Sequence, residues 1–182
     1  SASTLSYDSL VLALGSSPNR PPIPGIELQG ISSAVNLDEA EYIKSALSAK
    51  NNSHVVVVGG GFIGLELAVA IGEMWGIPTS VIEIAPQVLP NFLSPSFARM
   101  VQQDLASKNI AGHTDEKVLR FEGKDGRVCK VITNKREIPA ELVIMSAGVR
   151  PNTDIANEAG LGVTEKGLLV VDEHMRTSDP AM

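Results

Sequence analysis

The stretch that decides the fold is HVVVVGGGFIGLELA, residues 54–68. It begins with an uninterrupted β-branched run at residues 55–58, which is typical of a strand buried on both faces of a parallel sheet. Glycines follow directly, although they cost backbone entropy and add no side chain to a core. Their G-x-G-x-x-G spacing, between a strand and an apolar helical pattern, predicts a turn that binds the pyrophosphate of a dinucleotide.

Each glycine of this turn has its own expected role. Gly59 permits the tight turn, Gly61 lets backbone N–H groups approach a pyrophosphate, and Gly64 lets the helix pack closely on the strand. The helix that starts here offers unpaired N–H donors and the positive end of its dipole. Gly60 and Ile63, in the same turn, are also predicted cofactor-binding residues. A glycine-rich turn without a ligand is the alternative.

An acidic residue is expected at the end of the second strand, where it would accept hydrogen bonds from the ribose hydroxyls of adenosine. Residues 79–84 form a second apolar run, and Glu83 lies in it, 24 residues after Gly59. Its carboxylate would repel a 2′-phosphate, and residues 84–87 contain no Lys or Arg to offset that repulsion. The pattern favours NAD(H) over NADP(H), with a surface glutamate at a strand end as the alternative.

Three helices are predicted from their caps and their apolar spacing. The first covers residues 36–47 and is capped by Asn36, the second follows the glycine turn and ends at Gly76, and the third begins after Ser94. The residues expected to face the core are Ala40, Ile43 and Leu47 in the first helix, Ile63, Leu67, Ala70, Ile71 and Met74 in the second, and Phe97, Met100, Val101 and Leu105 in the third.

The pattern changes after a weak third parallel strand at residues 109–113. Three short segments joined by turn residues then predict an antiparallel meander, over residues 117–123, 126–133 and 136–140. Asp125-Gly126 between the first two is a strong hairpin signal. Residues 140–148 return to a buried strand. The fold class is therefore α/β, a three-layer Rossmann-like ββα domain with helices on one side of a parallel sheet and the meander on the other.

Composition narrows the function classes. The 182 residues carry 15 Lys and Arg against 21 Asp and Glu, without a basic block, so nucleic acid and membranes are not expected partners. The single cysteine, Cys129, excludes an internal disulfide and fits a reducing cytoplasm. We expect it to be structural. The positions of His54, His113 and His174 show no metal-ligand spacing, and we predict neither a metal site nor a catalytic residue in this chain.

Four segments together form a more specific pattern. They are YDSLVLALGSSPNRPPIPG (residues 7–25), VVVVGGGFIGLELA (55–68), VIMSAGVRPNT (143–153) and VDEHMRTSDPA (171–181). In this order they resemble the pyridine nucleotide-disulfide oxidoreductase superfamily of FAD- and NAD(P)-binding flavoproteins. The first segment contains a predicted apolar strand at residues 7–16, followed by a proline-rich linker.

The resemblance implies that the chain is a piece of a longer flavoprotein. Residues 1–20 would be a remnant of an FAD-domain strand and its linker, and residues 21–182 the NAD(H)-binding domain. The family's first FAD fingerprint would lie upstream of Ser1, and its IYAxGD motif would begin at Met182. We therefore expect the chain to bind NADH without FAD and without turnover. Its two ends also suggest an excised fragment.

In the whole protein, the resemblance implies hydride transfer from NADH to FAD and on to a disulfide, oxygen or a redox protein. Residues 83–110 are similar to NADH oxidases and CoA-disulfide reductases, whereas residues 169–180 are equally similar to ferredoxin and rubredoxin reductases. The expected partners are NADH and the FAD domain of the same parent chain, with self-association left open. A non-enzymatic NAD-sensing module is the alternative.

The resemblance also implies residues for the nicotinamide end of the cofactor. Phe62 occupies the aromatic position that in relatives lies over the nicotinamide pocket and moves when cofactor binds, and Glu66 matches an acid that reaches the nicotinamide. Gly148 and Val149, at the end of the return strand, would let the backbone approach the nicotinamide ribose. The alternatives are ordinary packing for Phe62 and a solvated helix position for Glu66.

Overall fold

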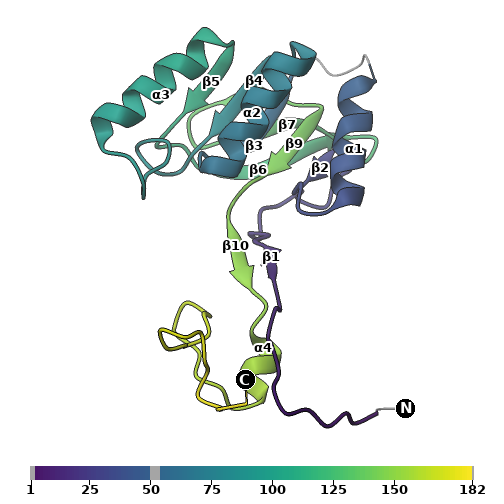
Figure 1. Ribbon diagram of the computed structural model, residues 1–182. Helices are drawn as coiled ribbons and strands as arrows, with labels where there is room; N and C mark the ends of the chain where they lie inside the picture. Colours follow the sequence, from purple (N-terminus) through teal and green to yellow (C-terminus); the bar gives the residue numbers. More distant parts are fainter. Residues whose placement is uncertain (1–2, 50–53, 182) are drawn as a thin grey trace. The chain divides into compact units, whose positions relative to one another are not determined.

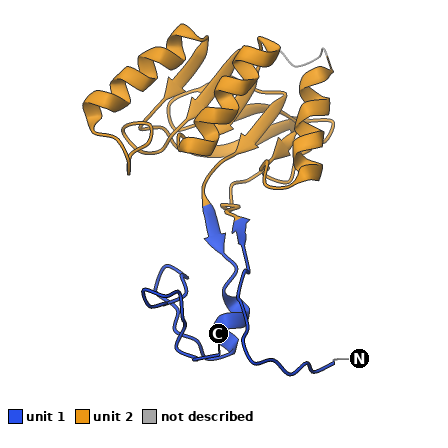
Figure 2. Cartoon of the chain, in the orientation of Figure 1, with its two compact units in different colours: residues 1–17, 149–182 blue, residues 18–148 orange. Residues whose placement is uncertain are grey.

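The computed structural model describes residues 3–49 and 54–181. The chain forms two compact units, one of residues 18–148 and one that combines the chain up to residue 17 with the chain from residue 149 (Figure 2). No helix within the two described ranges is both long and apolar enough to cross a membrane. The division into an FAD-domain remnant at residues 1–20 and an NAD(H)-binding domain at residues 21–182 stays a prediction.

The unit of residues 18–148 is built on a parallel sheet. Its strand order in the described chain is β2 (Ile31–Ser32), β9 (Leu142–Met145), β3 (Val55–Val58), β4 (Thr79–Ile82) and β5 (Ile110–His113). Val55 of β3 pairs with Leu142 on one side and with Thr79 on the other. The weak strand predicted at residues 109–113 is confirmed as the edge strand β5, whereas the other edge strand, β2, was not predicted.

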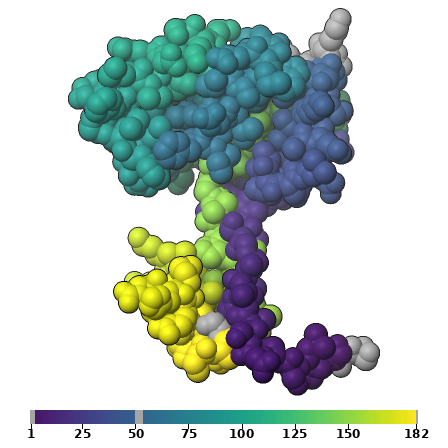
Figure 3. All heavy atoms as spheres, in the orientation of Figure 1, coloured from purple at the N-terminus to yellow at the C-terminus, as the bar shows by residue number. Residues whose placement is uncertain are grey.

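Helices cover one face of this sheet and the antiparallel meander covers the other (Figure 1). The helices are α1 (Leu37–Ser48), α2 (Phe62–Trp75) and α3 (Pro95–Ser107). They lie side by side on the face seen in the space-filling view (Figure 3). The meander consists of β6 (Val118–Lys124), β7 (Arg127–Thr133) and β8 (Glu137–Pro139). The predicted three-layer Rossmann-like fold is confirmed.

The β-branched run of β3 joins the three layers. Val55 and Val57 are buried in the cluster that the helices contribute to, whereas Val56 is buried against the meander. Successive side chains of a strand point to opposite faces, so a strand covered on both sides needs an apolar residue at every position. Burial of each valine stabilises the fold by roughly 1.5–3 kcal/mol.

The helices form where they are expected, but part of each predicted buried face is wrong. Asn36 caps α1 by accepting a hydrogen bond from the N–H of Glu39 at 2.8 Å, and Gly76 ends α2 in the left-handed conformation. The predicted core residues that are exposed are Ala40, Ile63, Met74, Phe97 and Met100. The helix residues that pack against the sheet without having been predicted are mostly small, namely Ala46 in α1, Gly64, Leu65 and Ala68 in α2, and Ala98 in α3.

The meander turn has the geometry that its sequence predicts. Asp125 and Gly126 have φ values of 53° and 79°, so both central residues lie in the left-handed region, as a type I′ hairpin requires. The turn connects β6 and β7, which pair from Val118 with Thr133 to Lys124 with Arg127.

The unit formed by the two chain ends holds only short elements in its described part. β1 (Ser16–Pro18) and β10 (Val149–Pro151) form a two-stranded sheet, and α4 (Asp154–Glu158) follows. The predicted strand at residues 7–16 is wrong for residues 7–15, which form none. A strand needs a neighbour for its backbone groups, and the described chain gives these residues no strand partner.

Candidate functional site

The glycine turn lies at the carboxyl end of β3 and leads directly into α2. Gly59 has φ = +118°, a conformation that L side chains rarely adopt. A Cβ on Gly59 would lie 2.1 Å from the carbonyl oxygen of Ser146, which follows β9. Glycine is therefore required here by conformation and by space, as expected for the tight turn.

Gly64 sets how closely α2 packs on β3. A Cβ at this position would lie 2.0 Å from the carbonyl oxygen of Gly59 and 3.3 Å from a methyl carbon of Val57. Any larger residue would push the helix away from the strand. The close approach expected from the third glycine of the motif is present.

The outer side of the turn is open. Gly61 is the N-cap of α2, no side chain caps the helix there, and a Cβ on Gly61 would meet no atom within 4 Å. The first N–H groups of a helix have no partner within the helix, and the first turn of α2 carries no acidic residue to neutralise its positive end. A pyrophosphate fits this place, because it needs N–H donors and positive potential.

Glu83 lies directly against the glycine turn. Its Oε2 accepts a hydrogen bond from the N–H of Gly60 at 2.7 Å, and its Oε1 accepts one from the N–H of Ala85 at 2.8 Å. A Cβ on Gly60 would come within 3.0 Å of the Glu83 Cβ, so the missing side chain makes room for the glutamate. A carboxylate oxygen has two lone-pair sites, so each oxygen can still accept a ribose hydroxyl. The sequence predicted both residues but not their contact.

Phe62, the first residue of α2, packs against an aromatic residue that was not predicted from the sequence. The rings of Phe62 and Phe92 meet edge to face, with centroids 4.6 Å apart, and both side chains are more than half exposed. The loop that carries Phe92 is tied to the glycine turn, since the N–H of Leu89 donates to the carbonyl of Gly60 at 2.9 Å. Ile63 and Glu66 are also exposed on this part of α2, and their cofactor contacts stay predictions.

Gly148 lies in the loop after β9, with φ = +83°. Asn19, which was not predicted, holds this loop: its N–H donates to the carbonyl of Gly148 at 2.9 Å and its side-chain amide to that of Ala147 at 3.1 Å. Because Ser146 approaches Gly59, the loop begins beside the glycine turn. Val149 belongs to the unit of the chain ends, and its role stays a prediction.

The side chains of His54 and His113 make none of the contacts of the glycine turn. His54 Nε2 is 2.9 Å from the Ser80 hydroxyl, and burial lowers the pKa of His54 while the nearby Glu141 partly offsets the shift. Burial, and then the charge of Arg136, lower the pKa of His113. In residues 3–49 and 54–181, no three His, Cys, Asp or Glu side chains gather as metal ligands.

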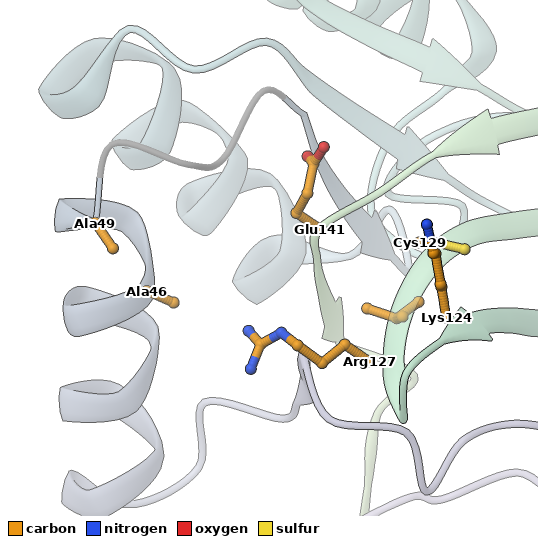
Figure 4. Close-up of a pocket in the computed structure, with 7 residues that line it drawn as sticks. Ala46, Ala49, Lys124, Arg127, Cys129 and Glu141 are labelled. Atoms are coloured by element: carbon orange, nitrogen blue, oxygen red, sulfur yellow. The ribbon is translucent and has the colours of Figure 1, made fainter.

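A separate cavity of about 330 Å³ lies at the other end of the sheet (Figure 4). It is lined by Ala46, Ala49, Lys124, Arg127, Val128, Cys129 and Glu141. Glu141 immediately precedes β9, so the cavity lies at the amino end of the strand whose carboxyl end adjoins the glycine turn. It contains none of the predicted cofactor residues. The Cys129 thiol is exposed, with its Sγ 3.5 Å from the carbonyl oxygen of Glu122.

Comparison with known proteins identifies the family. The family model described as pyridine nucleotide-disulphide oxidoreductase matches residues 1–182. The chain belongs to this family. The resemblance predicted from the four sequence segments is thereby confirmed over the length of the chain.

Individual relatives agree with this assignment. An NADH oxidase of Enterococcus faecalis is 36% identical over 178 residues, which cover 97% of this chain and 39% of the oxidase. A crystal structure of an FAD-dependent pyridine nucleotide-disulphide oxidoreductase from Desulfovibrio vulgaris is 52% identical with a TM-score of 0.87, over 97% of this chain and 45% of that one. A water-forming NADH oxidase from Lactobacillus brevis, bound to NADH, is 28% identical with a TM-score of 0.89, over 98% of this chain and 39% of that one. The chain thus spans less than half the length of these relatives.

Proposed function

We propose that the unit of residues 18–148 binds NADH at the glycine turn. The pyrophosphate would accept hydrogen bonds from the N–H groups around Gly61 at the start of α2, and Glu83 would accept bonds from the hydroxyls of the adenosine ribose. The observation that supports this proposal is the hydrogen bond from the N–H of Gly60 to Glu83, because it brings the carboxylate proposed for the ribose beside the turn proposed for the pyrophosphate. The Lactobacillus brevis relative with bound NADH supports the choice of ligand.

The nicotinamide end of the cofactor would lie toward Phe62, Ile63 and Glu66. The exposure of these side chains beside the turn supports this placement, since each is accessible to a ligand. Gly148 supports it from the neighbouring loop, where the absence of a side chain lets a ribose approach the backbone. The assignment of Val149 rests on the family resemblance alone.

For the whole protein we propose an FAD-dependent oxidoreductase of the cytoplasm. NADH bound here would supply a hydride to FAD held by the rest of the protein, for onward transfer to a disulfide, oxygen or a redox protein. The residues of this chain bind and orient the nucleotide. Alone, the 182-residue chain would bind NADH without FAD and without turnover.

A non-enzymatic NAD-sensing module is the second candidate. The segment of residues 7–25 argues against it, because it resembles the flavin-domain strand and linker of the family. Purification of the full-length protein separates the two: a yellow protein with bound FAD supports the enzyme, and a colourless one supports the sensor.

The binding proposal is tested by titrating the chain with NADH and with NADPH. Neutralising Glu83 with Glu83→Gln should weaken NADH binding by about tenfold, because a charge-assisted hydrogen bond is lost, and should leave NADPH binding unchanged or tighter. Glu73→Gln, which neutralises an exposed carboxylate elsewhere on α2, is the matched control and should change neither affinity. Tighter binding of NADPH than of NADH by the unsubstituted chain, or stoichiometric FAD on the purified chain, would refute the proposal.

A further inference from the structure

Glu116 is a buried carboxylate that the proposed site does not use. Its side chain is 1% exposed, and its Oε1 lies 2.6 Å from the hydroxyl of Thr133, which donates to it, and 3.0 Å from Nε of Arg136. A buried charge is costly unless a partner compensates it. The contacts with Thr133 and Arg136, at the turn between β7 and β8, therefore hold Glu116 in one position on the meander.

The backbone around Glu116 runs beside the backbone around Glu83. The N–H of Glu116 donates to the carbonyl of Glu83 at 3.0 Å, and the N–H of Asp115 donates to the carbonyl of Ala85 at 2.7 Å. In the other direction, the N–H of Glu83 donates to the carbonyl of His113 at 2.8 Å. These bonds continue the pairing of β4 with β5 beyond the ends of both strands.

The carboxylate of Glu83 depends on this same backbone. One of its two hydrogen-bond donors is the N–H of Ala85, at 2.8 Å from Oε1. Because the carbonyl of Ala85 is held by Asp115, any displacement of residues 115–116 would move that donor. The position of the Glu83 carboxylate is thus linked through the backbone to the anchoring of Glu116.

We infer that Glu116 is a positioning residue for Glu83. Anchored by Thr133 and Arg136, it fixes the turn that aims the Glu83 carboxylate at the adenosine ribose. The inference rests on the proposed function, in which Glu83 binds that ribose. It adds a buried residue, remote in sequence from the glycine motif, to the determinants of NADH affinity and of the preference for NADH over NADPH.

The first test removes the anchor with Glu116→Ala. NADH titration should show a dissociation constant raised about tenfold, with a lower ratio of NADH to NADPH affinity, because the ribose-binding carboxylate is no longer held in place. The same substitution in a chain that already carries Glu83→Gln should change the NADH dissociation constant by less than about twofold. A merely structural role would weaken binding in both backgrounds, and that result would overturn the inference.

A second pair of variants keeps Glu116 in place and changes its partner. Arg136→Gln removes the cation that contacts Glu116, whereas Lys135→Gln removes the neighbouring cation, which forms an exposed ion pair with Asp115 at 3.0 Å. In Arg136→Gln the Thr133 hydroxyl still donates to Glu116, so the carboxylate keeps one of its two partners, whereas Glu116→Ala removes both contacts. We expect about threefold weaker NADH binding for Arg136→Gln, and no change for Lys135→Gln because exposed pairs contribute little.

Different results would refute the proposed NADH binding and the positioning role of Glu116. If the unsubstituted chain does not bind NADH, the proposed function falls and the inference falls with it. If the chain binds NADH and Glu83→Gln weakens binding, but Arg136→Gln and Lys135→Gln bind alike, the function stands and only the positioning role of Glu116 is overturned. All titrations are run at a temperature where the fluorescence of Trp75, the single tryptophan, reports a folded chain.

Discussion

Replacing Gly64 with alanine should destabilise the fold, although alanine favours helices. A Cβ at this position would lie 2.0 Å from the carbonyl oxygen of Gly59, and this distance must grow to about 3.4 Å before the contact is an ordinary one. The obstacle is backbone, which cannot swing aside as a side chain can. We therefore take the upper end of the usual overpacking cost, about 3 kcal/mol. Alanine offsets about 1 kcal/mol of this by its helix propensity, which leaves a net loss of about 2 kcal/mol.

Gly72 provides the matched control within the same helix. A Cβ on Gly72 would meet its nearest neighbours at 3.6 Å, so Gly72→Ala should be neutral or stabilise the fold by about 0.5–1 kcal/mol. Urea unfolding followed by the fluorescence of Trp75, which lies at the end of α2, measures both variants. If Gly64→Ala were as stable as the unsubstituted chain, or if Gly72→Ala lost as much stability as Gly64→Ala, the argument from close helix–strand packing would be refuted.

Two further predictions concern the hairpin turn and the response to pH. Gly126→Ala should lower the free energy of unfolding by about 1 kcal/mol, because φ is +79° and a Cβ there meets no atom, so the cost is conformational alone. Gly126→Asn should lose less unfolding free energy, because asparagine tolerates the left-handed conformation better. Equal urea midpoints for the two variants would contradict this. Burial lowers the pKa of His54, so near this pKa the folded chain binds fewer protons at His54 than the unfolded chain does. The stability that His54 contributes is therefore present above a pH of about 6.5 and is lost as the pH falls below it. The loss of unfolding free energy between pH 7.5 and 5.5 should therefore be smaller in His54→Gln, and an equal loss in both chains would disprove the assignment.

The layers of the fold could be predicted because buried strands carry a strong local signal. The uninterrupted run at residues 55–58 requires cover on both faces, and the Asp125-Gly126 turn requires a hairpin. β2 could not be predicted in this way. It has two residues, and it is a strand only because Ile31 and Ser32 pair with β9, a partner more than 100 residues away.

The helix faces were harder to predict, above all in α2, because apolar residues lie on most sides of that helix. In α2, Ile63 and Met74 fit a helical stripe, yet both are exposed and Ala68 is buried. Close approach to the sheet favours the smallest side chains at the point of contact, as Gly64 and Ala98 show. Hydrophobic periodicity ranks large residues first, so it finds Ile71 but also includes exposed residues and omits the small residues at the closest contact.

The residues of the candidate site likewise differ in whether the sequence could predict them. The glycine turn and Glu83 could be predicted, because motif spacing and the position at a strand end express local requirements. The pairing of Phe62 with Phe92 and the anchoring of Glu116 by Arg136 could not, because each joins segments brought together only by the folded sheet. Neither residue type nor spacing marks such partners in a single sequence.

The contacts that build the turn would also prepare it for the proposed nucleotide. The N–H of Gly59 donates to the carbonyl of Ile82 at 2.8 Å, so β4 holds the start of the turn. The carbonyl of Gly59 faces Gly64, so α2 holds the other side. Both backbone groups of Gly59 are constrained, so the N–H donors that follow are already ordered. If the turn binds a nucleotide as proposed, little conformational entropy is left to lose on binding. A substitution that loosens the helix at Gly64 should therefore weaken nucleotide binding together with stability, even though its side chain would touch no ligand atom.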